Sequence, residues 1–198
     1  MGFEHPTPVQ EQAIPPSLAY KDLLVSAKTG SGKTVAFLLP MLQRLLSSRS
    51  TLFGTVAFLL PMLQRLLSSR STLFGTRALI LAPTRELARQ TYDQCLQLIE
   101  FTELKVGLIT GGEDFKQHQS LLRRNFEIII ATPGRLLELM NQESGDFSHL
   151  EVLVLDEADR MLDMGFSDDV LSIVSHCNAA RQTLLFSATL THFGVIKI

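Results

Sequence analysis

Six short runs of apolar and β-branched residues recur along the chain, and they constrain its fold more than any other feature. The runs occupy residues 23–27, 78–82, 106–110, 127–131, 152–155 and 183–186. Each is apolar along its length rather than in alternation, which is typical of strands covered on both faces. Segments of helical period lie between them, at residues 85–100, 135–141 and 168–175. This order predicts an α/β fold, a parallel sheet with helices on both faces.

The composition is that of one ordinary domain. The chain has 198 residues, 45% of them hydrophobic, which is enough to bury a single core. We therefore interpret residues 1–198 as one domain. The formal net charge of −2 gives no global basic field, so any contact with nucleic acid must come from a few placed groups.

The cysteines and the leucine-rich segments indicate the compartment. Cys95 and Cys177 lack the spacing of a metal site, which indicates a reducing compartment, and we interpret both as buried apolar residues. The segments 38–46 and 59–67 carry Gln and Arg and contain a proline, so neither has the length of a membrane span. The sequence predicts a cytoplasmic protein without membrane contact.

A glycine-rich loop follows the first apolar run, where ligands of parallel sheets bind. It reads AKTGSGKT at residues 27–34. The glycines let the backbone turn its N–H groups inward around phosphates, Lys33 can reach the β- and γ-phosphates, and the Thr34 hydroxyl can ligate Mg²⁺. Ala27 stands where the general pattern has glycine, and a turn that caps a helix is the alternative. We assign nucleotide binding to Thr29, Gly30, Ser31, Gly32, Lys33 and Thr34.

An acidic segment, DEADRMLDMGF, follows the run at residues 152–155. A metal bound to phosphates needs an acidic partner, and hydrolysis needs a group that orients or deprotonates water. Asp156 suits the first requirement and Glu157 the second. The alternative is that these acids only complement the dipole of a following helix.

Together these motifs resemble the first RecA-like domain of the DEAD-box family of ATP-dependent RNA helicases, over residues 2 to about 190. The resemblance implies a RecA-like fold, ATP and Mg²⁺ as cofactors, and catalysis by Lys33, Asp156 and Glu157. It also accounts for Ala27, which is the family's usual residue there. GFEHPTPVQ at residues 2–10 is similar to the family's adenine motif, which implies that Gln10 pairs with adenine. The alternative is a polar residue early in a helix.

Three further motifs resemble the family's RNA contacts: PTRELA at 83–88, GG at 111–112 and TPGR at 132–135. The RNA-binding residues so implied are Thr84, Arg85, Gly111, Gly112, Thr132 and Arg135. Contacts of this kind reach the RNA backbone, so we expect sequence-independent binding. SAT at 187–189 implies that Ser187 and Thr189 bond to Asp159 and link hydrolysis to strand separation. Thr84 is at the same time a plain N-cap. For the other two motifs the alternatives are GG as a simple turn and SAT as a helix cap.

The resemblance also implies a second RecA-like domain, which is absent from these 198 residues. That domain supplies an arginine to the transferring phosphoryl group and half of the RNA groove, so we expect this chain alone to bind nucleotide weakly and hydrolyse little. The function so implied is ATP-coupled RNA binding and duplex unwinding. A nucleotide-gated RNA clamp or scaffold, and a chain made to test a duplicated helix, are the alternatives.

One segment of the chain is written twice. TVAFLLPMLQRLLSSRSTLFG occupies residues 34–54 and returns unchanged at 55–75. Two identical copies without a third do not make a solenoid. Because the first copy begins at Thr34 in the phosphate loop, we interpret the second as surplus, a recent or deliberate tandem insertion.

The surplus copy leads to four structural expectations. We expect a helix break near residues 47–54, a second helix at 56–67 and a connection to the strand at Arg77. An apolar stripe without an assigned cavity invites self-association or disorder; it comprises Val56, Leu59, Leu60, Leu63 and Leu67. In the alternative arrangement the second copy takes the first copy's groove, which would pull Lys33 and Thr34 from the phosphate site.

Overall fold

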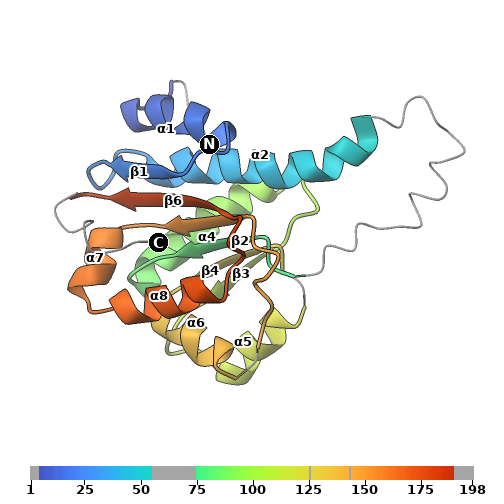
Figure 1. Cartoon of the computed structure of the whole chain (residues 1–198), viewed down its shortest axis with the longest axis vertical. Helices are drawn as coiled ribbons and strands as arrows, with labels where there is room; N and C mark the ends of the chain where they lie inside the picture. The colour runs from blue at the N-terminus through green and yellow to red at the C-terminus, as the bar shows by residue number, and fades with distance from the viewer. Residues whose placement is uncertain (1–4, 55–74, 125, 143, 190–198) are drawn as a thin grey trace, which may run out of the picture.

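One parallel sheet organises the molecule (Figure 1). The computed structural model describes residues 5–54, 75–124, 126–142 and 144–189. Across these residues the sheet has the strand order β1-β6-β5-β2-β4-β3, and all neighbouring strands are parallel. The strands are β1 (Leu23–Ser26), β2 (Ala78–Leu81), β3 (Val106–Ile109), β4 (Ile128–Ala131), β5 (Val152–Leu155) and β6 (Gln182–Ser187). Each predicted strand is present, with its ends within one residue of the prediction, and the α/β class is confirmed.

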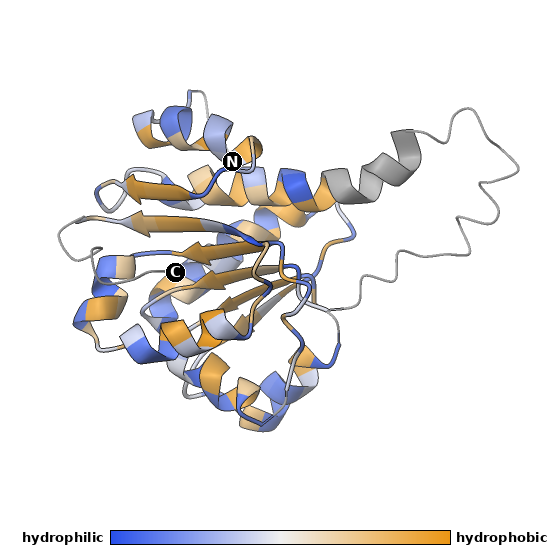
Figure 2. Cartoon of the chain, viewed as in Figure 1, coloured by the Kyte–Doolittle hydropathy of each residue, from blue (hydrophilic) through white to orange (hydrophobic). Residues whose placement is uncertain are grey.

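Helices cover both faces of the sheet. One face packs against α1 (Pro8–Leu18), α2 (Lys33–Gly54) and α4 (Arg85–Ile99). The other packs against α5 (Phe115–Leu122), α6 (Pro133–Met140), α7 (Ala158–Asp163) and α8 (Ser167–Ser175). The central strands are apolar on both sides, as their orange ribbons in Figure 2 show, because β2, β4 and β5 are buried at every position. Burial in a parallel sheet explains their unbroken apolar sequence.

Strand β1 departs from the prediction that every strand is covered on both faces. It lies at the edge of the sheet, and its residues alternate between partly buried and exposed. Leu23 and Val25 pack against the core beneath α1 and α2, whereas the Leu24 side chain is 54% exposed. At the edge of the sheet, helices need not cover both faces of a strand. A continuous apolar sequence therefore does not show that both faces of an edge strand are buried.

Helix α2 contradicts the predicted break near residues 47–54, because it runs without interruption from Lys33 to Gly54. Ser and Thr disfavour a helix by only roughly half a kcal/mol each, and lengthening a formed helix needs no new nucleus. Phe37, Leu38 and Leu45 of α2 are fully buried, and the Phe37 ring lies 5.3 Å from that of Phe186 in β6. The helix predicted at 56–67, with its apolar stripe, lies outside the described residues.

The cysteines are only partly as predicted. Cys95 in α4 is fully buried, but Cys177 after α8 is half-buried. Burial raises the pKa of the Cys95 thiol to about 12 and that of Cys177 to about 11, so both remain protonated at neutral pH. None of the described helices is long and apolar enough to cross a membrane.

Candidate functional site

The phosphate loop lies between β1 and α2, as the sequence predicted. Gly30 and Gly32 have φ values of 79° and 91°, a region that favours glycine. The backbone N–H of Ala27 donates to the Ser187 carbonyl at 2.9 Å and ties the loop to β6. Lys33 is buried, and its Nζ donates to the Ala27 carbonyl at 2.8 Å. The lysine is therefore held inside the loop that the sequence assigned to phosphates.

The start of α1 rests on this loop and explains why Gly32 is a glycine. A Cβ on Gly32 would lie 2.6 Å from Gln10 Nε2 and 3.0 Å from Thr7 Oγ1. Gln10 Nε2 donates to the Gly32 carbonyl at 3.1 Å, and its Oε1 accepts from the Thr7 N–H at 3.0 Å. The Oε1 bond is the Gln10 half of a capping box, and the Nε2 bond joins α1 to the loop. The pairing of Gln10 with adenine stays a prediction, and it requires these contacts to be exchanged.

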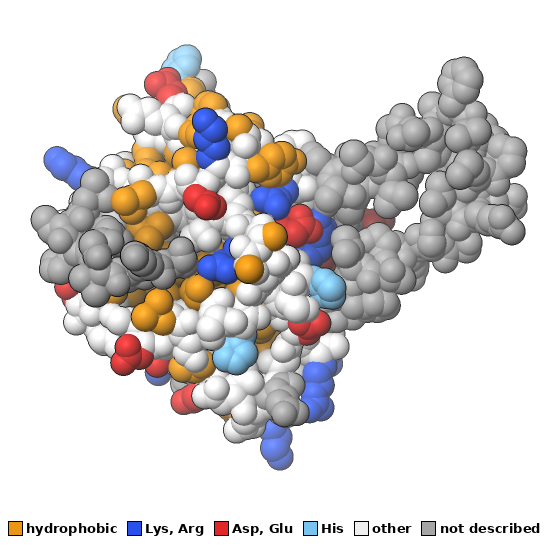
Figure 3. All heavy atoms as spheres, in the orientation of Figure 1, with side chains coloured by type: hydrophobic (Ala, Val, Ile, Leu, Met, Phe, Trp, Pro, Cys, Tyr) orange, Lys and Arg blue, Asp and Glu red, His pale blue; other side chains and the backbone are white. Residues whose placement is uncertain are grey.

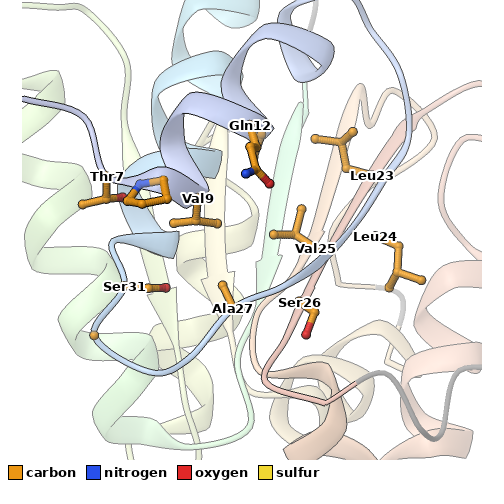
Figure 4. Close-up of a pocket in the computed structure, with 12 residues that line it drawn as sticks. Thr7, Val9, Gln12, Leu23, Leu24, Val25, Ser26, Ala27 and Ser31 are labelled. Carbon is orange, nitrogen blue, oxygen red and sulfur yellow. The ribbon is translucent and has the colours of Figure 1, made fainter.

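A cavity of about 580 Å³ opens beside the loop, between α1 and the edge strand β1 (Figure 4). Val9, Gln12 and Val25 approach one another across it in Figure 4, while Leu24 points away from α1. The hydroxyls of Thr7 and Ser31 are buried on its lining and have no hydrogen-bond partner within the described structure. Polar groups that are buried and unpaired are expected to bind a ligand or water.

Asp156 lies at the end of β5, where only 2% of its surface is exposed. Its Oδ1 accepts from the Glu157 N–H at 3.0 Å. Burial raises the pKa of this carboxyl to about 6, the positive charge of Lys33 opposes the rise, and the negative charge of Glu157 adds to it. The structure thus brings together the lysine and the carboxylate that the sequence assigned to phosphate and metal.

Glu157 has a strained backbone that sequence analysis missed. Its φ of 50° and ψ of 51° lie in the left-handed region, which costs a non-glycine residue about 1 kcal/mol. Its side chain accepts from Arg160 Nη1 at 3.3 Å. Strain of this kind concentrates at functional sites, where the surrounding structure holds it. No sequence pattern signals it, because the strain comes from the turn between β5 and α7.

Asp159 connects the acidic segment to the residues after β6. Its Oδ2 accepts from the Ala188 N–H at 3.1 Å and from the N–H and hydroxyl of Thr189, each at 3.0 Å. Burial raises the pKa of this carboxyl, but the bonds from Thr189 and Arg160 outweigh it and hold the pKa below its ordinary value. Thr189 therefore bonds Asp159 as predicted. The Ser187 hydroxyl donates to the Thr189 carbonyl at 2.6 Å, and a hydrogen bond from its side chain also lowers the pKa of Asp159.

A second cavity, of about 440 Å³, lies where β2, β3 and β4 end. Because these strands are neighbours in the sheet, their carboxyl ends bring the three predicted RNA motifs together. The cavity is lined by five of the six residues predicted for RNA: Thr84, Arg85, Gly111, Thr132 and Arg135. Sequence analysis missed Met164 and Phe166, which supply an apolar wall. Their only signal was the MGF sequence that follows the acidic motif.

Arg85 explains the two glycines of the GG motif. Its guanidinium lies over the Gly111–Gly112 turn. A Cβ on Gly111 would be 3.3 Å from Nη2, and a Cβ on Gly112 would overlap Nη1. Gly112 also has a φ of 83°. Thr84 caps α4 by accepting from the Leu87 N–H at 3.2 Å, so its plain capping function is confirmed. The lack of a Cβ at both positions therefore leaves room for the Arg85 guanidinium.

Charged side chains of both signs are mixed on the surface. Basic and acidic side chains are interspersed on the face shown in Figure 3. This agrees with the small formal net charge of −2. Recognition of an anion must therefore depend on the placed groups Lys33, Arg85 and Arg135 rather than on an extended field.

The fold and the first site define the class. A parallel sheet with helices on both faces, a glycine-rich phosphate loop after β1 and a buried carboxylate after β5 are those of a RecA-like P-loop nucleotide-binding domain. The chain matches the family model for DEAD/DEAH box helicases over residues 7–53 and 54–195, and it belongs to this family. The two matched segments meet one residue before the junction of the two sequence copies.

Relatives and solved structures agree with this assignment. The chain is 46% identical over 191 residues to a probable ATP-dependent RNA helicase, ddx27, of Dictyostelium discoideum, and covers 22% of it. It is 44% identical over 189 residues to the ATP-dependent RNA helicase SrmB of Escherichia coli K12, and covers 38% of it. Each alignment includes 96% of this chain. The chain thus spans well under half the length of these curated relatives.

Two solved structures share the fold over 96% of this chain. A hypothetical ATP-dependent RNA helicase from Sulfolobus tokodaii has a TM-score of 0.76 at 36% identity, and 48% of that chain is covered. The yeast DEAD-box splicing factor Prp28 has a TM-score of 0.77 at 34% identity, and 42% of that chain is covered. The RecA-like fold predicted from the sequence is confirmed.

Proposed function

We propose that the chain is the ATP-binding core domain of an ATP-dependent RNA helicase, acting in a reducing, cytoplasmic compartment. The observation that carries the proposal is a buried lysine in a glycine-rich loop, Lys33, whose charge acts on the buried carboxyl of Asp156. The names of the relatives support ATP as the nucleotide and RNA as the second ligand. Residues 1–198 would act as a single domain within a longer protein.

The residues of the first site fit ATP with Mg²⁺. The loop N–H groups from Thr29 to Thr34 would hold the phosphates, with Lys33 as their cation and the unpaired Ser31 hydroxyl as a further donor. Thr34 and Asp156 would hold Mg²⁺, which when bound neutralises phosphate charge. Glu157 would orient or deprotonate the attacking water, and Gln10 would contact adenine.

The second cavity fits an RNA backbone. Arg85 and Arg135 offer guanidinium groups to phosphates, and the first N–H groups of α4, after Thr84, add an anion site. The Gly111–Gly112 turn allows the Arg85 guanidinium to approach its backbone closely, and Gly111 and Thr132 line the same cavity. Contacts of these kinds carry no base identity, so binding would be sequence-independent. The Asp159–Thr189 bonds, supported by Ser187, would couple the acidic segment to movement after β6.

Duplex unwinding would require more than these residues. The relatives are longer, and we propose that a second RecA-like domain completes both sites in the full protein. The 198-residue chain alone would therefore show little RNA-stimulated ATP turnover. A clamp that retains RNA without opening duplexes uses the same residues. Comparing unwinding with RNA retention in the longer protein separates the two functions.

Calorimetry with a non-hydrolysable ATP analogue and Mg²⁺ tests the nucleotide site. Lys33→Ala should weaken binding by about tenfold or more, because a buried cation that faces phosphates is lost. Lys21→Ala is the control, since it removes an exposed lysine charge before β1, away from the loop. Unchanged affinity of the Lys33→Ala variant would overturn the proposal.

A matched pair of arginines on α4 tests the RNA site. Arg85 lines the second cavity, whereas Arg89 lies one turn further along the exposed surface and pairs with Asp93 at 3.3 Å. Arg85→Ala should weaken the binding of a single-stranded RNA at low salt by about tenfold, and Arg89→Ala by much less. Equal losses would mean that only general charge attracts RNA and that the cavity is not the site.

A further inference from the structure

His118 is a buried titratable side chain that the proposed function does not use. It lies on α5, and only 3% of its surface is exposed. Its ring is held between two charged residues. Nε2 lies 3.0 Å from Glu113 Oε2, and Nδ1 lies 3.3 Å from Arg135 Nη1. The ring therefore joins the turn after the GG motif to the arginine of the TPGR motif.

These contacts fix the tautomer of the ring. A guanidinium can only donate hydrogen bonds, so Nδ1 must accept from Arg135. The ring proton must then be on Nε2, which donates it to the Glu113 carboxylate. Glu113 thus sets the tautomer, and the tautomer makes His118 an acceptor for Arg135.

The hydrogen bonds of Arg135 engage only some of its guanidinium N–H groups. Its Nε donates to Glu138 Oε2 at 3.0 Å, and its Nη1 donates to the Glu113 carbonyl at 2.8 Å and to His118. A guanidinium has five N–H groups, and these bonds occupy three. Within the described residues no hydrogen bond engages Nη2. The Phe115 ring, whose centroid lies 5.7 Å from the guanidinium carbon, further restricts the plane of the group.

We propose that His118 is a positioning residue for RNA binding: it holds Nη1 of Arg135 so that Nη2 is presented to a backbone phosphate in the second cavity. The inference rests on the proposed RNA function. Without an acceptor at Nδ1, one partly buried N–H of Arg135 loses its partner, and the guanidinium can rotate to satisfy it elsewhere. Binding that depends on two aligned N–H groups weakens when that alignment is lost.

The test compares two substitutions of His118, each with and without Arg135→Ala. Binding of a fluorescein-labelled, single-stranded RNA ten-mer to the 198-residue chain is followed by anisotropy at low salt. His118→Leu should raise the Kd about fivefold, which corresponds to one hydrogen bond. His118→Asn should stay within about twofold of wild type, because its amide oxygen can replace Nδ1 as the acceptor. In the Arg135→Ala background, His118→Leu should cause no further loss.

These outcomes separate the inference from the proposed function. If Arg135→Ala leaves RNA affinity unchanged, the phosphate contact and the inference both fail. If Arg135→Ala weakens binding but His118→Leu does not, only the inference fails. If His118→Leu weakens binding equally with and without Arg135, His118 is merely structural, and the inference is again overturned.

A measurement on the wild-type chain does not depend on any variant folding. Long-range ¹H–¹⁵N spectra of the imidazole ring at pH 7.5 distinguish the two tautomers and the charged form. We expect His118 to carry its proton on Nε2 only. A proton on Nδ1 would exclude the hydrogen bond from Arg135 and overturn the proposal.

Discussion

Asp156 and Asp159 stand three positions apart in one acidic motif, yet their surroundings act on them in opposite directions. Burial raises the pKa of Asp156 to about 6, whereas hydrogen bonds outweigh burial at Asp159 and lower its pKa. An ionised Asp156 therefore costs the folded chain stability, and an ionised Asp159 contributes to it. The proposed Mg²⁺ beside Asp156 would offset this cost.

Asp156→Asn should stabilise the chain when no metal or nucleotide is present. Because the folded pKa is above the ordinary value of 3.8, this carboxyl favours folding at low pH, and the benefit is lost as pH rises through about 6. At pH 7.5 the variant should gain on the order of 2 kcal/mol in free energy of unfolding, and the gain should disappear toward pH 4. Urea unfolding across this pH range measures it.

Asp159→Asn is the matched control and should have the opposite sign, losing stability at neutral pH. Asp156→Asn should also remove the Mg²⁺ dependence of nucleotide binding, because its neutral amide is a poor ligand for Mg²⁺. A variant that is less stable than wild type at pH 7.5 would contradict the burial argument. Retained Mg²⁺ dependence would contradict the metal assignment.

Gly30 and Gly32 form a second residue-scale test, since both have positive φ but only Gly32 is crowded. An alanine Cβ at Gly30 would meet nothing within 4 Å, while at Gly32 it would press against Gln10 Nε2. Gly30→Ala should cost about 1 kcal/mol from backbone strain alone. Gly32→Ala should cost clearly more and should weaken nucleotide binding, because α1 must move off the loop. Thermal unfolding and calorimetry measure both, and equal effects would argue against the α1 contact.

At this scale the sequence predicted which residues converge but not how they are held. Motif spacing placed Lys33, Asp156 and Arg85 at strand ends, and the parallel sheet brought them into two sites. The tautomer of His118 depends on Glu113 and Arg135, which lie on either side of it in sequence. The left-handed Glu157 depends on a turn. Such features arise from tertiary contacts, which periodicity does not encode.

At the scale of elements, apolar runs located all six described strands because buried parallel strands need no polar face. The same rule failed at β1, where position in the sheet, rather than composition, leaves Leu24 exposed. A different prediction failed for α2: the Ser- and Arg-rich segment at residues 47–54 predicted a helix break, but the helix continues through it. A long helix that is already nucleated can continue through weak helix formers such as serine and threonine.

Helix α2 allows a test in which the chain supplies its own control. Leu45 is fully buried in α2, and its carbonyl accepts from Arg77 Nη1 at 3.4 Å. Leu66 is the identical position of the second copy. Leu45→Ala should destabilise the chain by about 2–5 kcal/mol, because it opens a cavity in the core. Leu66→Ala should have little effect if the first copy occupies the groove.

Chemical denaturation of the two variants measures the difference. Equal losses would show that both copies exchange in the groove. A larger loss for Leu66→Ala would show that the second copy is the resident one. In either case Lys33 and Thr34 would be displaced from the phosphate site in some molecules. The apparent nucleotide affinity of the chain would then be reduced by that fraction.

At the scale of the whole molecule, the break between the two stretches that match the family model falls next to the junction of the two sequence copies. The family model matches on both sides of residue 53, and the first copy already forms α2 against the sheet. Loop closure entropy grows only logarithmically, so 21 further residues between α2 and β2 cost on the order of 1 kcal/mol or less. The fold can therefore accommodate them.

Deleting residues 55–75 should leave the fold and the nucleotide site intact, because Gly54 would then lead directly to Thr76 before β2. We expect the free energy of unfolding to change by about 1 kcal/mol or less and nucleotide affinity to stay within about twofold. We also propose that the second copy's apolar stripe promotes self-association, so sedimentation should show fewer oligomers after the deletion. A deleted chain that fails to fold would show that the second copy is structural. Wild type that sediments as a monomer would contradict the association.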